Sequence, residues 1–382
     1  MTARPRLREL LLYFLQLGTL GFGGPIALAG YMQRDLVEIR GWITPEEYKQ
    51  GLALAQLAPG PLAAQLAMYL GWVRAGMLGA SLVSLAFIGP SFVMVLVLSI
   101  FYVRYGGLAW MQAVFYGVGA AVIAIIARSA LKLVRTTLGR DRLLLLLFGV
   151  SALVTAWTET EIVWLFVACG IVPILARLGR RTAMPMALSV APWPLLGLAP
   201  ASSAGILATI LGYFAAAGLF VFGSGLAIVP FLHGGVVLQH HWLTERQFLD
   251  AVAVSMITPG PVVITVAFIG YLVAGPAGAL AAAVGVFLPV YLVTVLAAPH
   301  FHRFAENPRV KAFVDGVTAA ATGAIAGAVF VLGRRALVDV PTVLIALGAL
   351  ALVMLAKKLP EPVVIAAAGL AGLLVRGVAP TP

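Results

Sequence analysis

The stretch QLAPGPLAAQ, residues 56–65, places two prolines and a glycine inside a segment that is apolar on both sides. Proline has no amide hydrogen and its ring clashes with the preceding turn, so this tripeptide must interrupt a helix. The same Pro-Gly-Pro returns in MITPGPVVIT, residues 256–265, and its flanks are again apolar. A helix break that occurs twice in matching surroundings indicates a feature that the fold requires.

The composition is that of a membrane protein. Of the 382 residues, 62% are hydrophobic and only 10% are charged, values outside the range of soluble domains. Many runs are long enough to cross about 30 Å of hydrocarbon as a helix. They lie near residues 8–30, 50–72, 76–102, 110–128, 142–157 and 161–177, and again near 204–228, 248–272, 276–299, 314–333, 339–356 and 361–376. The sequence therefore predicts an all-α polytopic membrane protein.

The charged residues argue against two other classes of function. The formal net charge is +11, but Lys and Arg occur in short clusters between apolar runs, a pattern that sets membrane topology and does not indicate nucleic acid. The few acids and histidines lie mostly in loops, so we predict that the protein is not an enzyme. The single cysteine, Cys169, can form neither a disulfide nor a cysteine metal site within one chain. We expect no cofactor and no bound metal.

The chain is an internal repeat. A shift of 200 residues pairs Phe14 with Phe214, Gly18 with Gly218, Trp42 with Trp242 and Pro59-Gly60-Pro61 with Pro259-Gly260-Pro261; a shift of 199 pairs Gly71 with Gly270, Gly76 with Gly275 and Pro90 with Pro289. These residue types are poorly interchangeable, so the matches carry weight. We predict two homologous halves, residues 1–181 and 204–382, joined by a linker at 182–203, because the stretch 177–203 is rich in Pro and Arg. The N-terminus imitates a signal peptide, but its counterpart at 211–225 indicates that it belongs to the mature fold.

The breaks also bear on topology. If each Pro-Gly-Pro turns a re-entrant hairpin back, each half has about five spans, and an odd number inverts the second half. The loop cations then favour an external N-terminus, although Arg4, Arg6 and Arg8 fit only if the first segment is re-entrant too. Two halves with matching interrupted helices are typical of secondary transporters, which bind substrate near the bilayer midplane at the repeat interface.

Each break can bind an anion. Pro61 and Pro261 suit the start of a half-helix, whose free N–H groups and positive dipole end attract an anion without a buried cation. A second break occurs in the first segment of each half, GFGGPIALAG at 21–30 and VFGSGLAIVP at 221–230, where tight helix packing is an alternative explanation. The polar side chains beside the breaks could donate to an oxyanion or bond between helices. The predicted substrate-binding residues are Phe22, Gly23, Gly24, Pro25, Gln56, Pro59, Gly60, Pro61, Gln65, Gly223, Ser224, Gly225, Ser255, Thr258, Pro259, Gly260, Pro261 and Thr265.

Three further residues have alternative roles. Arg34 and Arg40 could give a cavity mouth positive potential or could anchor the chain to the leaflet. Asp315, near the start of an apolar segment, could carry a coupling proton or cap a helix. The segment that contains Arg34 and Arg40 ends in Thr44-Pro45-Glu46-Glu47, which resembles a helix cap with proline at the first position and acids in the first turn.

These motifs resemble one known family. FGGP at 22–25, QRDLVEIRGWITPEEY at 33–48, LAQLAPGPLAAQLAMYLGW at 54–72 and RAGMLGASLVSLAFIGPSF at 74–92 are similar to the N-terminal half of the chromate ion transporter family in its long, two-domain form. The resemblance implies inverted halves and export of chromate from the bacterial cytoplasm across the inner membrane, powered by the membrane potential or a proton gradient. Sulfate, another tetrahedral dianion, or an anion channel of the same fold are alternatives. The expected partners are the lipid bilayer and, as an open alternative, a second copy of the chain.

Overall fold

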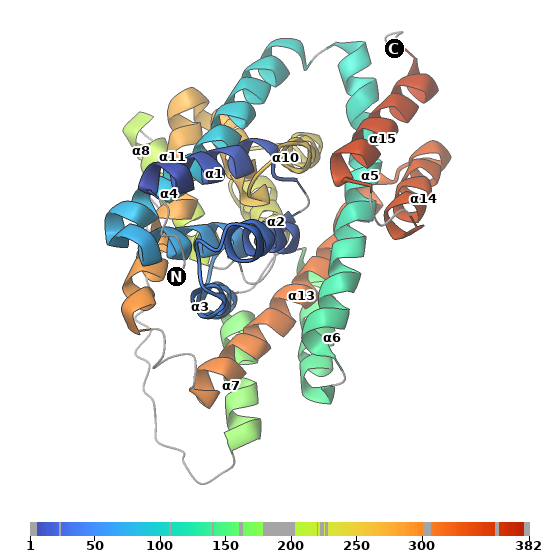
Figure 1. Ribbon diagram of the computed structural model, residues 1–382. Helices are drawn as coiled ribbons and strands as arrows, with labels where there is room; N and C mark the ends of the chain where they lie inside the picture. Colours follow the sequence, from blue (N-terminus) through green and yellow to red (C-terminus); the bar gives the residue numbers. More distant parts are fainter. Residues whose placement is uncertain are drawn as a thin grey trace.

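A computed structural model describes residues 6–22, 24–106, 108–139, 141–159, 163–178, 203–219, 221, 225, 228–300, 307–355 and 359–377. Within these ranges every regular element is a helix (Figure 1). The first half contains α1 (Leu7–Leu20), α2 (Gly24–Met32), the π-helix η1 (Gln33–Ile39), α3 (Pro45–Leu57), α4 (Leu62–Tyr105), α5 (Ala109–Leu133), η2 (Val134–Leu138), α6 (Arg142–Thr158) and α7 (Val163–Leu178). The second half contains α8 (Ser203–Leu219), α9 (Ile228–Leu232), η5 (His233–Gln239), α10 (Glu245–Ile257), η6 (Val262–Ile264), α11 (Thr265–Ala297), η7 (Ala298–His300), α13 (Pro308–Ala336), α14 (Val340–Leu355) and α15 (Glu361–Arg376). The all-α class and the repeated order of elements are confirmed.

Two of the long helices contain a sharp reversal at matched positions. Four stretches of the described chain are long and apolar enough to cross a membrane: Leu62–Tyr105, Ala109–Leu133, Val262–His300 and Pro308–Ala336. α4 leaves helical geometry at Ala75 and Gly76, and α11 does so at Ala274 and Gly275. Gly76 has φ 57°, a left-handed conformation that glycine adopts at no steric cost. A Cβ on Gly71 would lie 2.5 Å from the carbonyl oxygen of Gly79, so the two arms of α4 lie against each other as a hairpin.

The Pro-Gly-Pro segment turns the chain back within the membrane. α3 packs against the first arm of α4, with Gly51 against Tyr69 and the Tyr69 hydroxyl donating to Oε1 of Gln50 at 3.2 Å. These contacts join residues at similar distances on either side of the tripeptide, so the two helices are antiparallel. At 1.5 Å per residue, the 13 residues of α3 extend only about 20 Å, less than the hydrocarbon thickness. The predicted re-entrant hairpin is confirmed.

The first segment also folds back on itself. The Tyr13 hydroxyl of α1 lies 3.5 Å from Oδ2 of Asp35 in η1, and the Arg40 guanidinium lies 5.4 Å from the Tyr13 ring. The second half repeats the arrangement, because the Tyr213 ring of α8 lies 5.7 Å from the Trp242 ring. Each half therefore has two re-entrant hairpins. Their tips are marked, among the described residues, by Gly21 and Gly24, by residues 59–61, by Val221 and Gly225, and by residues 259–261. A re-entrant first segment is the arrangement in which the basic residues at the start of the chain agree with the distribution of the other loop cations.

The second hairpin of each half begins at a capped helix, as predicted for the first half. The Thr44 hydroxyl accepts the Glu47 N–H at 3.2 Å, and Oε2 of Glu47 accepts the Thr44 N–H at 2.8 Å. Thr244 and Gln247 form the same reciprocal pair at the start of α10. Such a capping box satisfies donors that have no partner inside the helix. The capping boxes thus define the residue at which the second hairpin of each half starts.

The second half lies upside down relative to the first. The Ser81 hydroxyl, near the start of the long arm of α4, lies 2.7 Å from the Tyr291 hydroxyl near the end of α11. At the other end of α4, the Tyr102 hydroxyl donates to Oδ2 of Asp250 in α10 at 2.7 Å. These contacts make α4 and α11 antiparallel, which confirms the inverted repeat. We call the side that carries the start of α1 and the end of η1 the N-face, and the side that carries the ends of α4, α6 and α13 and the start of α10 the C-face.

The halves exchange helices. α5 of the first half packs against α14 and α15, whereas α13 of the second half packs against α6 and α7 (Figure 1). Small residues occupy these contacts: Gly117 faces Ala368 and Gly372, and Gly323 faces Phe148 and Ser151. Close backbone approach through glycine is the usual basis of helix association in lipid, where apolar side chains gain little by pairing. Each half therefore completes the other, and α1, α4, α8 and α11 pack against one another beside the exchanged helices (Figure 1).

Candidate functional site

The four hairpin tips meet at the repeat interface. The Gly60 N–H donates to the Val221 carbonyl at 2.6 Å, and the Gly260 N–H donates to the Gly21 carbonyl at 2.9 Å. Residues 21 and 221 are equivalent in the repeat, so each Pro-Gly-Pro bonds to the first tip of the other half. A Cβ on Gly225 would lie 3.8 Å from Cγ of Pro25, so the two first tips are also close. The structure brings together breaks that are far apart in sequence.

Helix N-termini point toward this junction. α4 begins at Leu62 after Pro61, which is the N-cap and provides no side-chain cap. The equivalent segment starts with the 3-10 turn η6 after Pro261 and continues as α11. α2 begins at Gly24, whose φ is 74°. The first amides of a helix have no intrahelical acceptor and carry its positive dipole end, so the tips can attract an anion without a full positive charge.

Gln65 is the most unusual polar residue at the junction. Its side chain is fully buried, and Nε2 donates to the Pro59 carbonyl at 2.8 Å. Oε1 is buried and has no hydrogen-bond partner among the described residues. A buried carbonyl oxygen left unpaired costs free energy, so this atom suits a donor on a ligand, either water or a protonated oxyanion oxygen. The equivalent Thr265 instead donates to the Val262 carbonyl at 2.7 Å.

Ser91 contributes to the junction, although the sequence analysis did not select it. It is fully buried, and its hydroxyl lies 2.8 Å from the Pro259 carbonyl and 3.3 Å from the Gly18 carbonyl. Its equivalent in the second half is Val290, whose Cγ1 would lie 2.7 Å from a Cβ on Gly60. One tip thus lies against a hydroxyl and the other against a methyl group. The sequence contained a signal for this difference, because the match of Pro90 with Pro289 also aligns Ser91 with Val290.

The remaining predicted residues lie in several places. Ser255 and Thr258 are buried near the end of α10, and their hydroxyls donate to the Val252 and Val254 carbonyls of their own helix. Gln56 is exposed at the end of α3. Asp315 lies on α13 beside Gly316, which packs against Cys169 of α7, so it belongs to a different contact from the tips. The predicted residues Gly23, Gly223 and Ser224 are outside the described residues.

A cleft leads from the N-face to the first tip. Its volume is about 520 Å³, and it is lined by Tyr13, Gln16, Leu17, Leu20, Gly21, Phe22, Tyr31, Arg34, Asp35, Ile39, Arg40 and Pro360. Arg34 and Arg40 are at its outer end, where Nε of Arg34 lies 2.9 Å from Oδ1 of Asp35 and the Arg40 guanidinium lies 4.5 Å from the Trp42 ring. Gly21 and Phe22 are at its inner end. The cleft thus connects two predicted cations with the predicted break.

A buried carboxylate was also missed. Asp250 is 4% exposed on α10, and the Tyr102 hydroxyl of the other half is its donor. Its equivalent, Gln50, accepts from Tyr69 in the same way. The segment that contains Asp250 reads as amphipathic in sequence, which places charged residues on a surface. The burial comes from α4, which belongs to the other half and is remote in sequence.

Two inverted helical halves, whose broken helices meet within the membrane, define the architecture of a secondary transporter. The profile of the family described as "Chromate transporter" matches residues 8–174 and 208–373. A "Chromate transport protein" of Cupriavidus metallidurans is 58% identical over 383 residues, covering 96% of this chain and 93% of that protein. A "Probable chromate transport protein" of Synechococcus elongatus is 55% identical with 96% and 95% coverage, and a "Chromate transport protein" of Pseudomonas aeruginosa is 35% identical with 96% and 92% coverage.

The chain belongs to the chromate transporter family. The matches extend over both halves, in agreement with the repeat in the sequence and in the structure. No solved structure matches the chain.

Proposed function

We propose that the protein exports chromate from the cytoplasm and holds the anion among the four hairpin tips. The observation that carries this proposal is the reciprocal bonding of Gly60 to Val221 and of Gly260 to Gly21. These bonds bring helix N-termini and polar backbone from both halves to one place at the interface of the inverted repeats. The printed names of the relatives supply chromate as the cargo.

The distribution of cations supports a cytoplasmic N-face. Among the described residues, the Lys and Arg at or near the N-face are Arg6, Arg8, Arg34, Arg40, Lys49, Arg74, Arg128, Lys132, Arg135, Arg142, Arg177, Arg309 and Lys311. Those at or near the C-face are Arg104, Arg246, Arg334, Arg335 and Arg376. Lys and Arg concentrate in cytoplasmic loops. This orientation puts the N-terminus inside the cell. An external N-terminus is expected only when the first segment crosses the membrane, and here that segment is re-entrant.

The cleft at the N-face is then the route by which cytoplasmic chromate reaches the site. Arg34 and Arg40 at its outer end raise the local concentration of a dianion. At the inner end, amides and dipoles replace water around the anion. Because these are partial charges, the site binds weakly enough for release on the other face. Rocking of one half against the other would alternate access around the tips.

The membrane potential can drive this movement. One elementary charge moved across 100 mV corresponds to about 2.3 kcal/mol, so a dianion leaving a negative interior gains about twice that amount. The purified protein in liposomes should therefore move chromate toward the positive side when a potential is imposed. Absence of flux above that of empty liposomes, under either a potential or a pH gradient, would refute the proposal.

Sulfate is a second candidate cargo. The tip contacts come mainly from backbone groups, which recognise charge and shape, and sulfate shares the tetrahedral geometry and charge of chromate. Competition by sulfate, molybdate and phosphate in the liposome assay decides between the two anions. Chromate as cargo predicts that excess sulfate lowers the chromate rate only weakly. Flux that does not saturate and shows no counterflow would indicate an anion channel of the same fold.

A further inference from the structure

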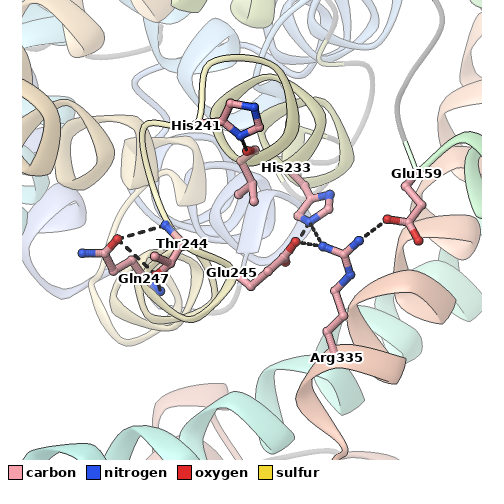
Figure 2. Close-up of polar contacts among 8 residues, drawn as sticks. Glu159, His233, His241, Thr244, Glu245, Gln247 and Arg335 are labelled. Carbon is pink, nitrogen blue, oxygen red and sulfur yellow. Dashed lines mark hydrogen bonds and ion pairs between the residues drawn. The ribbon is translucent and has the colours of Figure 1, made fainter.

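Four polar side chains form one cluster at the C-face, at the opposite end of α10 from the Pro-Gly-Pro tip (Figure 2). Arg335 at the end of α13 pairs with Glu159, which follows α6, and with Glu245 at the start of α10. Nε2 of His233, the first residue of η5, lies 2.9 Å from Oε2 of Glu245 and 3.4 Å from a terminal nitrogen of Arg335. The Phe248 ring lies 5.4 Å from the imidazole. The cluster thus joins four separate elements.

The cluster lies on the boundary between two groups of helices. α1, α4, α8 and α11 pack together and carry the hairpins, to which η5 and α10 belong (Figure 1). In the second group, α6 and α7 pack against α13, and α14 and α15 pack against α5. The boundary runs along α10, which also contacts α5 and α15. Glu159 is in the same group as Arg335, whereas Glu245 and His233 contact Arg335 across the boundary.

The same boundary is open at the N-face. The cleft of about 520 Å³ lies there, with Tyr13 of α1 and Arg34 of η1 on one side and Pro360, the N-cap of α15, on the other. The two equivalent π-helices differ accordingly in burial. Gln33 and Arg34 of η1 are exposed, whereas η5 is buried from His233 to Val237. The structure is therefore open at the N-face and closed at the C-face.

The repeat does not copy the ion pairs to the N-face. A shift of 200 residues gives the equivalents of His233 and Glu245, and a shift of 199 gives those of Arg335 and Glu159. These four equivalent residues are Gln33, Pro45, Thr136 and Lys358. They hold a single charge, so they can form no ion pair with one another. A closed C-face thus has polar contacts that a closed N-face would lack, which favours the arrangement that the structure shows.

The strength of the contacts suits a closure that opens repeatedly. The side chains of Arg335, Glu159 and Glu245 are 28%, 36% and 33% exposed, so water screens their attraction and hydrates each group once they part. Burial and the Arg335 guanidinium lower the pKa of His233, which keeps the imidazole neutral. Two carboxylates beside one guanidinium then leave the cluster negative, which disfavours an anion site. A mechanical role fits these properties.

We propose that the cluster of Glu159, His233, Glu245 and Arg335 is the outer gate of the transport path. A transporter with alternating access must close one face while the other is open, and the cluster closes the C-face while the N-face cleft is open. Arg335 makes the contacts across the boundary, and Glu159 positions its guanidinium. Opening separates η5 and the start of α10 from the end of α13. The assignment rests on the proposed function for the cargo and its direction.

Labelling of a buried cysteine measures the gate without any cargo. The reporter is Val237→Cys on η5, a position 7% exposed, in a Cys169→Ala background and in lipid nanodiscs that leave both faces accessible. A maleimide reaches this thiol only when the C-face is open, so the labelling rate follows the population of that state. Arg335→Gln should raise the rate at least about fivefold, and Glu245→Gln should do the same by removing the other partner.

Arg334→Gln is the matched control. It removes the same charge from the next residue of α13, and Arg334 lies over the Phe330 ring at 5.8 Å, outside the ion pairs of the cluster. This variant should leave the rate within about twofold of the parent. A second reporter, Gln16→Cys, lines the N-face cleft and should label more slowly in Arg335→Gln, because opening of the C-face closes the N-face.

Each other outcome would overturn the gate. Equal labelling of Val237→Cys in Arg335→Gln and Arg334→Gln would show that the ion pairs do not hold the C-face closed. Faster labelling at both reporters would show that the variant has loosened as a whole. These rates need no chromate, so they stand apart from the liposome assay. Absence of chromate flux together with the expected labelling would refute the proposed cargo and leave a gate for another solute.

Discussion

Gly60 and Gly260 show how much a single residue decides at the tips. Both have positive φ, 140° and 96°, and both donate their N–H to the other half. A Cβ on Gly60 would lie 2.7 Å from Val290 Cγ1 and 2.9 Å from the Gln65 amide, and one on Gly260 would overlap the Ser91 hydroxyl. Any side chain here would strain the backbone and separate the two halves at the site.

Gly60→Leu and Gly260→Leu should therefore abolish chromate flux in liposomes while the protein still inserts into the membrane. The break itself remains, because both prolines are retained, so the effect should come from the separated tips. The matched control is Gly30→Leu, an exposed glycine on α2 whose Cβ would meet no atom within 4 Å. Rates in the two tip variants equal to that of the control would mean that the breaks serve architecture alone.

Gln65→Glu should lower the chromate rate at least roughly tenfold, a loss that corresponds to about 1.4 kcal/mol. The unpaired Oε1 of Gln65 is where a carboxylate would place a negative charge beside a bound dianion. Gln65→Met fills a similar volume without the charge and serves as the comparison. If both variants lost the same activity, packing rather than charge would explain the role of Gln65. The rates are measured as initial chromate uptake at matched protein density.

At the scale of elements, the hairpins follow from the sequence, whereas their partners do not. Matched Gly, Pro and Trp residues predicted the repeat, the breaks and the re-entrant Pro-Gly-Pro. The acceptors of the tip amides, Gly21 and Val221, are backbone carbonyls, which no side-chain pattern reveals. The exchange of α5 and α13 between halves was also not predicted, because small residues such as Gly117 and Gly323 permit close contact with many helices. The buried Asp250 was missed because α4, which covers it, belongs to the other half and is remote in sequence.

The exchange rests partly on one polar contact that can be removed. The Tyr116 hydroxyl of α5 lies 2.5 and 2.6 Å from the two carboxylate oxygens of Asp339, which also accepts the Thr342 N–H at the start of α14. Tyr116→Phe should lower stability by roughly 1 kcal/mol, the usual net value of a hydrogen bond. The melting temperature of the purified protein measures the loss. An unchanged value would show that α5 and α14 are held by apolar packing alone.

The same contact predicts a pH dependence with a definite sign. The hydrogen bond from Tyr116 lowers the pKa of the Asp339 carboxyl below its ordinary value. A group whose pKa is lowered on folding contributes stability above its unfolded pKa, and this is lost as pH falls through the folded pKa. The difference in melting temperature between wild type and Tyr116→Phe should therefore be full at neutral pH and should shrink in acid. A difference that grows in acid would contradict the assignment.

At the scale of the whole molecule, the inverted repeat makes equivalent positions lie on opposite sides of the membrane. Ile39 and Gln239 are equivalent, exposed, and last in η1 and η5. The native Cys169 is buried and can be replaced by alanine to give a cysteine-free background. In that background, Gln239→Cys should react with a membrane-impermeant maleimide in intact spheroplasts, whereas Ile39→Cys should react only after the membrane is opened. This follows from the proposed cytoplasmic N-face, which carries most of the cations among the residues that the structure describes. Labelling of both positions from one side would refute the inverted arrangement. A reversed pattern would keep the inversion but would place the cleft of Arg34 and Arg40 outside the cell. The cleft would then serve uptake rather than export.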